Sequence, residues 1–308
     1  MCESGQYTFA EMGIRLGRTA CSAVGQARRQ GICNRYVRPP KYTYDRSFFS
    51  RITLETSYWA AILTTDGCIT RRNSNPTIVW SAAGKDKGHM ELFQTAIRST
   101  HPLNLAMARC QLSTRDTQKR HINYRLTLEG AREWTADLER NFGVTHNKTL
   151  RCPPPNLPTL LHKLAYIRGY IDGDGHITCN QSDGVMSIGV CGVNREMIAW
   201  VRQVIEDMDL PKAKKARTAH IFQASGENCY YYSVRGFRAA VLFELLRRVP
   251  VPNLSRKWDN PTILAIVDKW KARTDLWPSP LFFDNLLSVN GLQDTPEVAP
   301  IIHLSAGV

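Results

Sequence analysis

A mostly apolar stretch from Ala165 to Ile171, followed by Asp172-Gly173-Asp174-Gly175, constrains the fold of this chain more than any other segment. The stretch is too short to span a membrane, and its length and glycine-rich ending predict a buried helix. Gly169 and Gly173 share one face of this helix, where the missing side chains would allow another backbone to approach closely. Gly175 would take the left-handed conformation that often follows a helix end. The helix is therefore expected to lie in a close contact with a second helix.

Asp174 is expected in the last turn of this helix. The partial negative charge of a helix C-terminus disfavours a carboxylate unless a cation lies beside it. An acid at that place, next to a close helix contact, indicates a metal site. The alternative is an exposed turn aspartate before a glycine. Such aspartates are common, and Asp174 taken alone favours this interpretation.

A second copy of the pattern runs from Tyr58 to Ile69, about 108 residues earlier in the chain. Asp66-Gly67 takes the place of Asp174-Gly175, and small residues again share one helix face at Ala61 and Thr65. Nearly the same spacing relates the segments 124–128 and 231–235, the helices expected to end at Leu138 and Leu245, and the lysines Lys148 and Lys257. This recurrence indicates a duplication. Two copies meeting through their small-faced helices would place Asp66 and Asp174 side by side at a pseudo-twofold axis.

Both copies resemble the motif of the LAGLIDADG family of homing endonucleases. Residues 168–175 are close to the usual second motif of that family, and residues 58–67 are a looser first copy, with Thr64 where an acid often stands. Phe48-Phe49 and the segment from Phe142 to Thr149 extend the resemblance, which covers residues 48 to 258. It implies an α+β fold of two pseudo-symmetric αββαββα repeats with saddle-shaped antiparallel sheets.

The hydrophobic pattern predicts the same order of elements. The first repeat, residues 51–150, is expected to form helices at 56–66, 87–99 and 130–142 and strand pairs at 68–83 and 105–128. The second repeat, residues 151–258, is expected to form helices at 159–174, 194–208 and 237–248 and strand pairs at 176–191 and 214–235. Residues 259–308 are expected to begin with a helix at 261–273 and to pack on the domain.

Residues 1–36 lie outside the repeats and resemble the last two helices of small Myb-like helix-turn-helix domains. Thr8 is expected to cap a helix that ends near Arg18, and Thr19 a second helix that runs to Ile32. The second helix would then lie in a major groove of DNA. A basic amphipathic helix pair packed on the main domain is the alternative. Residues 37–50 are expected to form a basic linker, because prolines there oppose regular structure.

The composition favours a nucleic-acid partner. The chain has 40 lysines and arginines against 27 acids, a formal net charge of +13. No apolar run is long enough to cross a membrane, and the N-terminus lacks the apolar core of a secretion signal. The nine cysteines include no Cys-x-x-Cys pair, so free thiols are expected rather than a zinc site or disulfides. We therefore expect no membrane association or secretion, and a cytoplasmic (phage or bacterial) or organellar location.

The expected strands carry polar side chains that suit a DNA groove. A two-stranded ribbon fits the major groove of B-DNA, and its alternating side chains let one face pack while the other meets the ligand. A solvated sheet face is the usual alternative for any single residue, but the whole set favours double-stranded DNA. The candidate contacts are Arg18, Ser22, Gln26, Arg29, Arg38, Lys41, Arg71, Arg72, Asn73, Arg115, Lys119, Arg120, Arg125, Thr178, Asn180, Gln181, Lys214, Lys215, Arg217, Gln223 and Arg235.

Asp66 and Asp174 suit Mg²⁺ or Mn²⁺, because hard ions prefer oxygen ligands and Mg²⁺ often takes only one or two carboxylates. The positions that follow them, Gly67 and Gly175, are candidate further ligands. The family resemblance implies that one acid from each motif serves one DNA strand. Asp172 is expected to be a helix or interface residue, since Thr64 in the other motif excludes a symmetric catalytic role.

Lys148 and Lys257 are the candidate catalytic lysines. The family resemblance implies a lysine near each metal site, where it could polarise water or stabilise developing charge. Solvation at the surface is the usual state of a single lysine. Arg256 would replace Lys257 if the alignment of the repeats were shifted by one residue.

Three functions are compatible with these features. The first is a monomeric, site-specific homing endonuclease of a mobile genetic element, which cuts both strands of a long asymmetric DNA target. The second is a splicing maturase that binds intron RNA on the same scaffold. The third is a non-catalytic DNA-binding regulator. Two acids and two lysines at matched positions favour the nuclease, because RNA binding requires neither pair.

Overall fold

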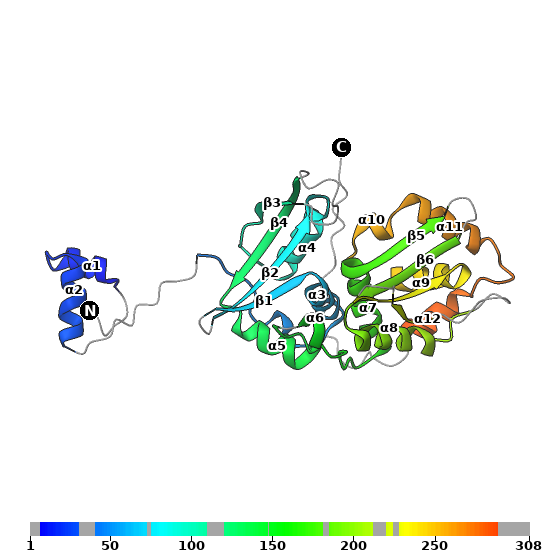
Figure 1. Cartoon of the computed structure of the whole chain (residues 1–308), viewed down its shortest axis with the longest axis horizontal. Helices are drawn as coiled ribbons and strands as arrows, with labels where there is room; N and C mark the ends of the chain where they lie inside the picture. The colour runs from blue at the N-terminus through cyan, green and yellow to red at the C-terminus, as the bar shows by residue number, and fades with distance from the viewer. Residues whose placement is uncertain are drawn as a thin grey trace. The chain divides into compact units, whose positions relative to one another are not determined.

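The computed structural model describes residues 7–30, 41–72, 75–109, 120–146, 148–180, 185–211, 220–223 and 228–288. The chain divides into two compact units, Met1–Thr43 and Tyr44–Val308, which are described separately (Figure 1). The second unit contains both repeats and therefore the candidate site.

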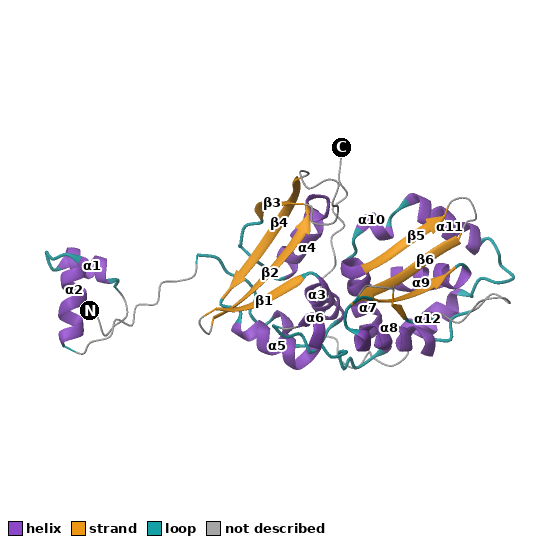
Figure 2. Ribbon diagram, in the orientation of Figure 1, coloured by secondary structure: helices purple, strands orange, loops and turns teal. Residues whose placement is uncertain are grey.

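Each repeat has the order helix, two strands, helix, two strands, helix, so the predicted α+β fold of two αββαββα repeats is confirmed (Figure 2). The first comprises α3 (Leu54–Thr65), β1 (Gly67–Arg72), β2 (Asn75–Ala83), α4 (Lys87–Ala96), β3 (Asn104–Arg109), β4 (Arg120–Glu129) and α5 (Arg132–Phe142). The second comprises α7 (Leu160–Asp174), β5 (Gly175–Asn180), β6 (Val185–Gly192), α8 (Arg195–Asp207), β7 (Phe222–Gln223), β8 (Tyr230–Arg235) and α9 (Phe237–Arg247). The two antiparallel sheets have equivalent strand orders, β1-β2-β4-β3 and β5-β6-β8-β7.

The alternation of apolar residues decides which face of each sheet is buried. Ile78 and Trp80 of β2 pair with Leu128 and Leu126 of β4, and all are buried. The equivalent positions of the second sheet are also paired and buried, and they are Ile188, Val190, Tyr232 and Val234. Because neighbouring residues on a strand point to opposite faces, the other face of each sheet carries the polar side chains.

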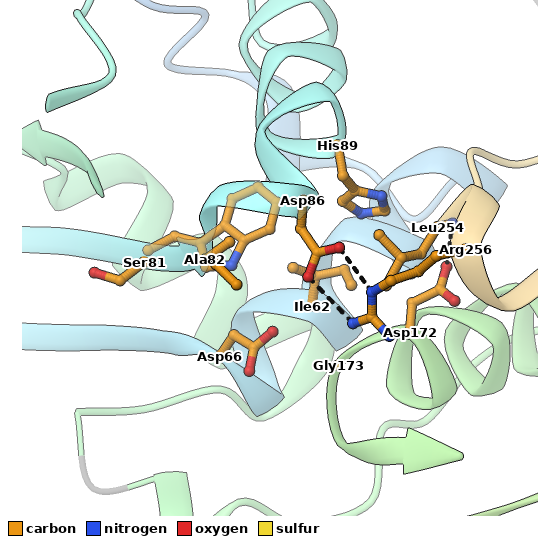
Figure 3. A pocket seen from close by; sticks show the side chains of 12 residues that line it. Ile62, Asp66, Ser81, Ala82, Asp86, His89, Asp172, Gly173, Leu254 and Arg256 are labelled. Atoms are coloured by element: carbon orange, nitrogen blue, oxygen red, sulfur yellow. Dashed lines mark hydrogen bonds and ion pairs between the residues drawn. The ribbon is translucent and has the colours of Figure 1, made fainter. Parts of the chain in front are cut away.

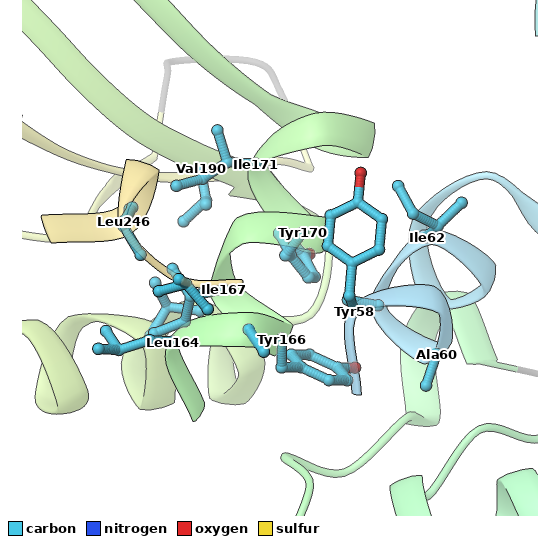
Figure 4. Packing of buried hydrophobic residues seen from close by; sticks show 14 of the residues in the cluster. Tyr58, Ala60, Ile62, Leu164, Tyr166, Ile167, Tyr170, Ile171, Val190 and Leu246 are labelled. Carbon is cyan, nitrogen blue, oxygen red and sulfur yellow. The ribbon is translucent and has the colours of Figure 1, made fainter. Parts of the chain in front are cut away.

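The helices α3 and α7 pack against each other between the two sheets, and most of their side chains are buried (Figure 4). A Cβ atom on Gly169 would overlap the carbonyl oxygen of Tyr58 and lie 2.9 Å from the Cβ of Ala61. A Cβ on Gly173 would overlap the hydroxyl group of Thr65. Glycine at both positions therefore permits this spacing, and the predicted contact between small-faced helices is confirmed.

Gly175 follows α7 in an extended conformation (φ −104°, ψ 174°), so the prediction of a left-handed residue at this helix end is wrong. The chain passes directly from the helix into β5, whose first residue pairs with Val190. Glycine is required here for space, because a Cβ would overlap the backbone of Ile171 and lie 2.8 Å from the carbonyl oxygen of Gly189. The same direct passage joins α3 to β1.

The N-terminal unit contains α1 (Phe9–Arg15) and α2 (Ala20–Arg29). Thr8 forms a capping box with Glu11, and the Thr19 side chain accepts from the backbone of Ser22, so both predicted helix starts are confirmed. The first helix ends at Arg15 rather than near Arg18, because the chain turns through Gly17, which has a φ of +60°. The second helix is described as far as Arg29, and the predicted extension to Ile32 lies outside the described residues.

Two further helices follow the second repeat. The helix predicted at 261–273 is present as α11 (Pro261–Lys271), and α12 (Pro280–Ser288) is an element that the sequence did not predict. Phe283 of α12 is fully buried, with the Arg248 guanidinium 4.4 Å from its ring centroid. The expectation that this part packs on the domain is confirmed as far as Ser288, and residues 289–308 lie outside the described part. Across the described ranges, no helix is long and apolar enough to cross a membrane.

Candidate active site

Asp66 and Asp174 stand at equivalent places, where the central helix of each repeat meets the first strand of its sheet. A capping box at Thr53 begins α3 and Asp66 follows its last residue, whereas Thr159 caps the start of α7 and Asp174 is its last residue. The two helices pack in parallel, since Gly169 opposes Tyr58 and Gly173 opposes Thr65. Their C-terminal ends therefore bring the two acids into one site, where the charge of Asp174 raises the pKa of Asp66.

The surroundings perturb the ionisation of both acids. The pKa of Asp66 is raised to about 6, first by burial and then by Asp174, against the opposing effect of Lys148 and Lys257. Burial also raises the pKa of Asp174, again opposed by the two lysines. Both aspartate side chains nevertheless reach solvent, so neighbouring protein atoms remove only part of their hydration. The site concentrates negative charge at a point that a ligand can reach.

The two candidate lysines are buried and bound to the ends of the central helices. Lys148, in the short helix α6 (Lys148–Arg151), donates from its Nζ to the carbonyl oxygens of Thr64 and Thr65. Lys257, in α10 (Ser255–Trp258), donates to the carbonyl oxygens of Ile171 at 2.6 Å, Asp172 at 2.9 Å and Gly175 at 2.8 Å. Each ammonium group thus satisfies carbonyls that a helix end leaves without partners.

Burial lowers the pKa of both lysines, and that of Lys257 falls to about 8. Asp174 and then Asp66 oppose the shift at Lys148, whereas Asp172 and then Asp66 are the acids that oppose it at Lys257. The structure therefore places both lysines in the electrostatic field of the two acids, in contrast to ordinary solvated surface lysines.

A pocket of about 200 Å³ opens beside Asp66 (Figure 3). Arg256 reaches into it from α10 and forms two hydrogen bonds with Asp86, from Nε at 2.7 Å and from a terminal nitrogen at 3.1 Å. Arg256 thus forms an ion pair in the pocket, whereas Lys257 binds the helix end. The other residues lining the pocket are Ile62, Trp80, Ser81, Ala82, Ala83, His89, Asp172, Gly173 and Leu254.

The sequence reasoning missed Asp86, whose charge also raises the pKa of Asp66. Asp86 precedes α4, and the equivalent residue before α8 is Asn194, which caps that helix with its side chain. A search for matched acids in the two repeats could not identify Asp86, because the second repeat has an amide there. Its position immediately before a helix was the available signal, and such a position is also typical of a simple helix cap.

Asp172 lies in the interface between the repeats and is buried, as predicted. Its carboxylate accepts hydrogen bonds from the Tyr58 hydroxyl at 2.6 Å, the Leu254 backbone at 3.1 Å and the Trp258 indole at 2.6 Å. The equivalent residue Thr64 has its hydroxyl 2.9 Å from that of Tyr166. The two contacts are related by the duplication, but only the second motif contributes a carboxylate.

Several predicted DNA contacts lie on the open faces of the two sheets. Thr178 pairs with Ser187, which pairs with Arg235, so polar side chains line up across β5, β6 and β8. Arg125 alternates with the buried Leu126 of β4 and donates to the Ser81 hydroxyl at 3.3 Å. Thr178, Asn180, Arg125 and Arg235 are exposed on these faces, whereas Gln223 is exposed on the edge strand β7 and, through its pairing with Tyr230, lies on the face of the buried Tyr232.

The remaining candidates are distributed over other parts of the chain. Arg18 and Lys41 are exposed residues of the N-terminal unit, and Ser22, Gln26 and Arg29 lie on α2. Arg71 and Arg72 lie on β1 and Arg120 on β4, and only their backbone is described. The candidates outside the described residues are Arg38, Asn73, Arg115, Lys119, Gln181, Lys214, Lys215 and Arg217.

No protein-family model matches the chain, and no curated protein matches it. Solved structures similar to this chain include LAGLIDADG homing endonucleases. One is a structure of mesophilic variants of the homing endonuclease I-DmoI, with a TM-score of 0.43 and 12% identity over 72% of this chain and 98% of that chain. Another is the LAGLIDADG meganuclease I-AabMI bound to uncleaved DNA, with a TM-score of 0.42 and 10% identity over 71% of this chain and 92% of that chain. A third is the LAGLIDADG homing endonuclease I-GzeII in complex with its DNA target, with a TM-score of 0.42 and 10% identity over 77% of this chain and 96% of that chain.

Proposed function

We propose that the chain is a LAGLIDADG homing endonuclease, a monomer that binds a long asymmetric double-stranded DNA target and hydrolyses phosphodiester bonds on both strands with a divalent metal. The observation that carries this proposal is the pairing of Asp66 with Asp174 at the ends of two packed helices. Each repeat supplies one acid and one buried lysine, which is the set of groups needed for two related cuts.

The donor set suits a hard divalent ion such as Mg²⁺ or Mn²⁺. Asp66 and Asp174 offer carboxylate oxygens at a point where burial and then the charge of Asp174 raise the pKa of Asp66, and a cation would relieve the repulsion between the two acids. Gly67 and Gly175 are further candidate ligands, and the carbonyl oxygen of Gly175 also accepts a hydrogen bond from Lys257. When bound, such an ion stabilises negative charge on the attacking and leaving oxygens of an in-line displacement.

The two lysines and the open sheet faces have separate roles in the proposed reaction. Lys148 and Lys257 hold positive charge beside the acids, where it stabilises the negative charge that develops at the scissile phosphate. Their hydrogen bonds to helix-end carbonyls fix the ammonium groups before substrate arrives, which reduces the reorganisation needed for catalysis. The polar open faces of the two sheets bind the DNA grooves on either side of the site.

The unlike sequences of the two repeats support an asymmetric target. Thr178 and Arg235 present polar groups on the second sheet, whereas the first sheet presents Ser81 of β2, which lines the pocket beside Asp66, and its partner Arg125 of β4. Two repeats in one chain also supply both acids without a second subunit, which supports a monomeric enzyme.

Cleavage of a supercoiled plasmid library with random inserts tests this proposal. The chain is incubated with Mg²⁺ or Mn²⁺, and linear products are sequenced and compared with those of Asp66→Asn and Asp174→Asn. The expected result is linear product at one recurring sequence, lost in both variants, with residual nicking by either variant assigning its acid to one strand.

Binding measurements with the same three proteins make a negative result informative. Tight metal-independent binding to intron RNA without any cutting would identify a maturase. Tight metal-independent binding to one DNA sequence without any cutting would identify a regulator, and either result would overturn the proposed nuclease.

A further inference from the structure

The segment from Leu254 to Trp258 is fastened at both ends by one buried carboxylate. Asp172 accepts the Leu254 backbone hydrogen bond at 3.1 Å and the Trp258 indole hydrogen bond at 2.6 Å. The Tyr58 hydroxyl, 2.6 Å from the same carboxylate, ties it to the opposite repeat. All three partners are donors, and an ionised carboxylate has enough acceptor sites for each of them.

The residues between these two attachment points enter the candidate active site. Lys257 donates three hydrogen bonds to main-chain carbonyl oxygens at the end of α7. Arg256 forms the ion pair with Asp86 in the pocket that Asp66 lines. Apart from Asp172 itself, Asp66 is the acid that acts most strongly on the charge of Lys257. Asp172, a carboxylate of the second motif, thus holds a segment whose charged groups act on Asp66, the acid of the first motif.

Among the described residues of the first repeat, no carboxylate forms an equivalent of this attachment. Thr64 stands at the place of Asp172, and its hydroxyl group contacts Tyr166 and the carbonyl oxygen of Ala60. Lys148 reaches the end of α3 from α6 through main-chain carbonyls alone. The two halves of the site are therefore supported in different ways, although their acids and lysines match.

We propose that Asp172 is a positioning residue that fixes Arg256 and Lys257 beside Asp66, and that it thereby supports cleavage of one DNA strand more than the other. This inference rests on the proposed nuclease function for its consequence in cleavage. The placement of Lys257 by Asp172 is independent of that function and can be measured in the protein without DNA or metal.

The placement is tested by chemical labelling of lysines in the full chain. Wild type and Asp172→Asn are treated with formaldehyde and cyanoborohydride at one pH, and mass spectrometry gives the methylation rate at Lys257 and Lys148. An amide at position 172 presents N–H donors where the native partners also donate, so the segment should open and Lys257 should be labelled about tenfold faster, with Lys148 unchanged. Thr64→Val, which removes the corresponding interface hydroxyl, is the matched control and should leave Lys257 unchanged.

Trp258→Phe is a second variant that removes a single donor and keeps an aromatic ring against Phe243, whose centroid lies 5.2 Å from that of Trp258. It should accelerate labelling of Lys257 in the same direction. Unchanged labelling of Lys257 in Trp258→Phe would overturn the positioning role, because Asp172→Asn also removes a charge that raises the pKa of Lys257 and therefore speeds labelling by itself. Equal acceleration at Lys148 would also overturn it, because it indicates general loosening of the fold.

Strand-resolved cleavage of an end-labelled target then tests the catalytic consequence. Asp66→Asn identifies the strand that depends on Asp66, and Asp172→Asn should slow that strand about tenfold more than the other, at unchanged DNA affinity. In combination with Lys257→Ala, the effects should not add, because both changes remove the same placed group. Equal slowing of both strands, or additive effects, would overturn the inference, whereas failure of the wild type to cut any DNA would instead remove the proposed function.

Discussion

Gly169 of α7 lies so close to Tyr58 of α3 that a methyl group on the glycine would overlap the carbonyl oxygen of the tyrosine. This approach, repeated one turn later between Gly173 and Thr65, sets the separation of the two helices. The helix ends carry Asp66 and Asp174, so the spacing of the candidate acids follows from backbone packing. Repulsion between the acids opposes this spacing, and after burial the charge of Asp174 is the next largest cause that raises the pKa of Asp66.

Gly169→Ala is expected to destabilise the fold by about 1–3 kcal/mol, because the added carbon meets backbone atoms that cannot move independently. Gly88→Ala in α4 is the matched control, since a Cβ there meets nothing within 4 Å. That change should stabilise the protein by about 0.4–1 kcal/mol through the unfolded chain. Urea unfolding of the two variants measures both values, and equal stabilities would contradict the close packing of α3 on α7.

The pKa of Asp66 predicts a pH dependence of stability in the absence of metal. The folded-state pKa is about 6 and lies above the ordinary value of 3.8, so between these values the folded protein holds more protons than the unfolded chain. The contribution of Asp66 to stability is therefore present below about pH 4 and is lost as the pH rises through 6.

Asp66→Asn removes this titration, so the free energy of unfolding should vary less with pH between the ordinary pKa of 3.8 and the folded-state pKa of about 6. The variant should also be more stable than wild type at pH 8. Unfolding free energies from pH 4 to 8 in chelator test this, and a wild-type profile that rises across this pH range relative to the variant would contradict the sign.

Asp86→Asn is expected to lower the pKa of Asp66, because the charge of Asp86 raises it. The same change leaves Arg256 without its carboxylate partner at the pocket, which adds positive charge beside Asp66. The pH range over which the contribution of Asp66 to stability is lost should therefore lie lower in Asp86→Asn than in wild type. Glu133→Gln, which removes the exposed acid paired with Arg46 away from the site, is the control and should leave this pH range unchanged.

The duplication made the central part of the site predictable from sequence. Asp66, Asp174, Lys148 and Lys257 are each matched by a partner in the other repeat, and small residues mark the helix contact. The conformation of Gly175 could not be predicted in this way, because the entry of the chain into β5 determines it.

The contacts that differ between the repeats also could not be predicted from the sequence pattern. Asp86 pairs with Arg256 only once the ends of the two repeats are brought together in space, and Asn194 breaks the match. The second attachment of Asp172, to Trp258, likewise depends on how the chain turns after α9. A repeat search detects what the copies share, whereas these contacts make them unequal.

The N-terminal unit supplies the last prediction. Its two helices bury only small surfaces, with Met12, Ala23 and Ala27 as the buried apolar residues among those described. The chain from Tyr44 onward forms a separate compact unit that holds both repeats. Deletion of residues 1–43 should therefore leave the unfolding transition of the repeats unchanged.

The same deletion should weaken DNA binding if α2 contacts the duplex, because Arg28 and Arg29 lie exposed in its last turn and phosphate contacts contribute strongly to affinity. The slope of log affinity against log salt should fall by about 0.9 for each phosphate contact that is lost. Arg28→Ala with Arg29→Ala in the full chain should reproduce part of this fall, whereas Glu11→Ala, in the first turn of α1, should not. An unchanged salt slope in both the deletion and the double variant would show that these helices do not contact DNA.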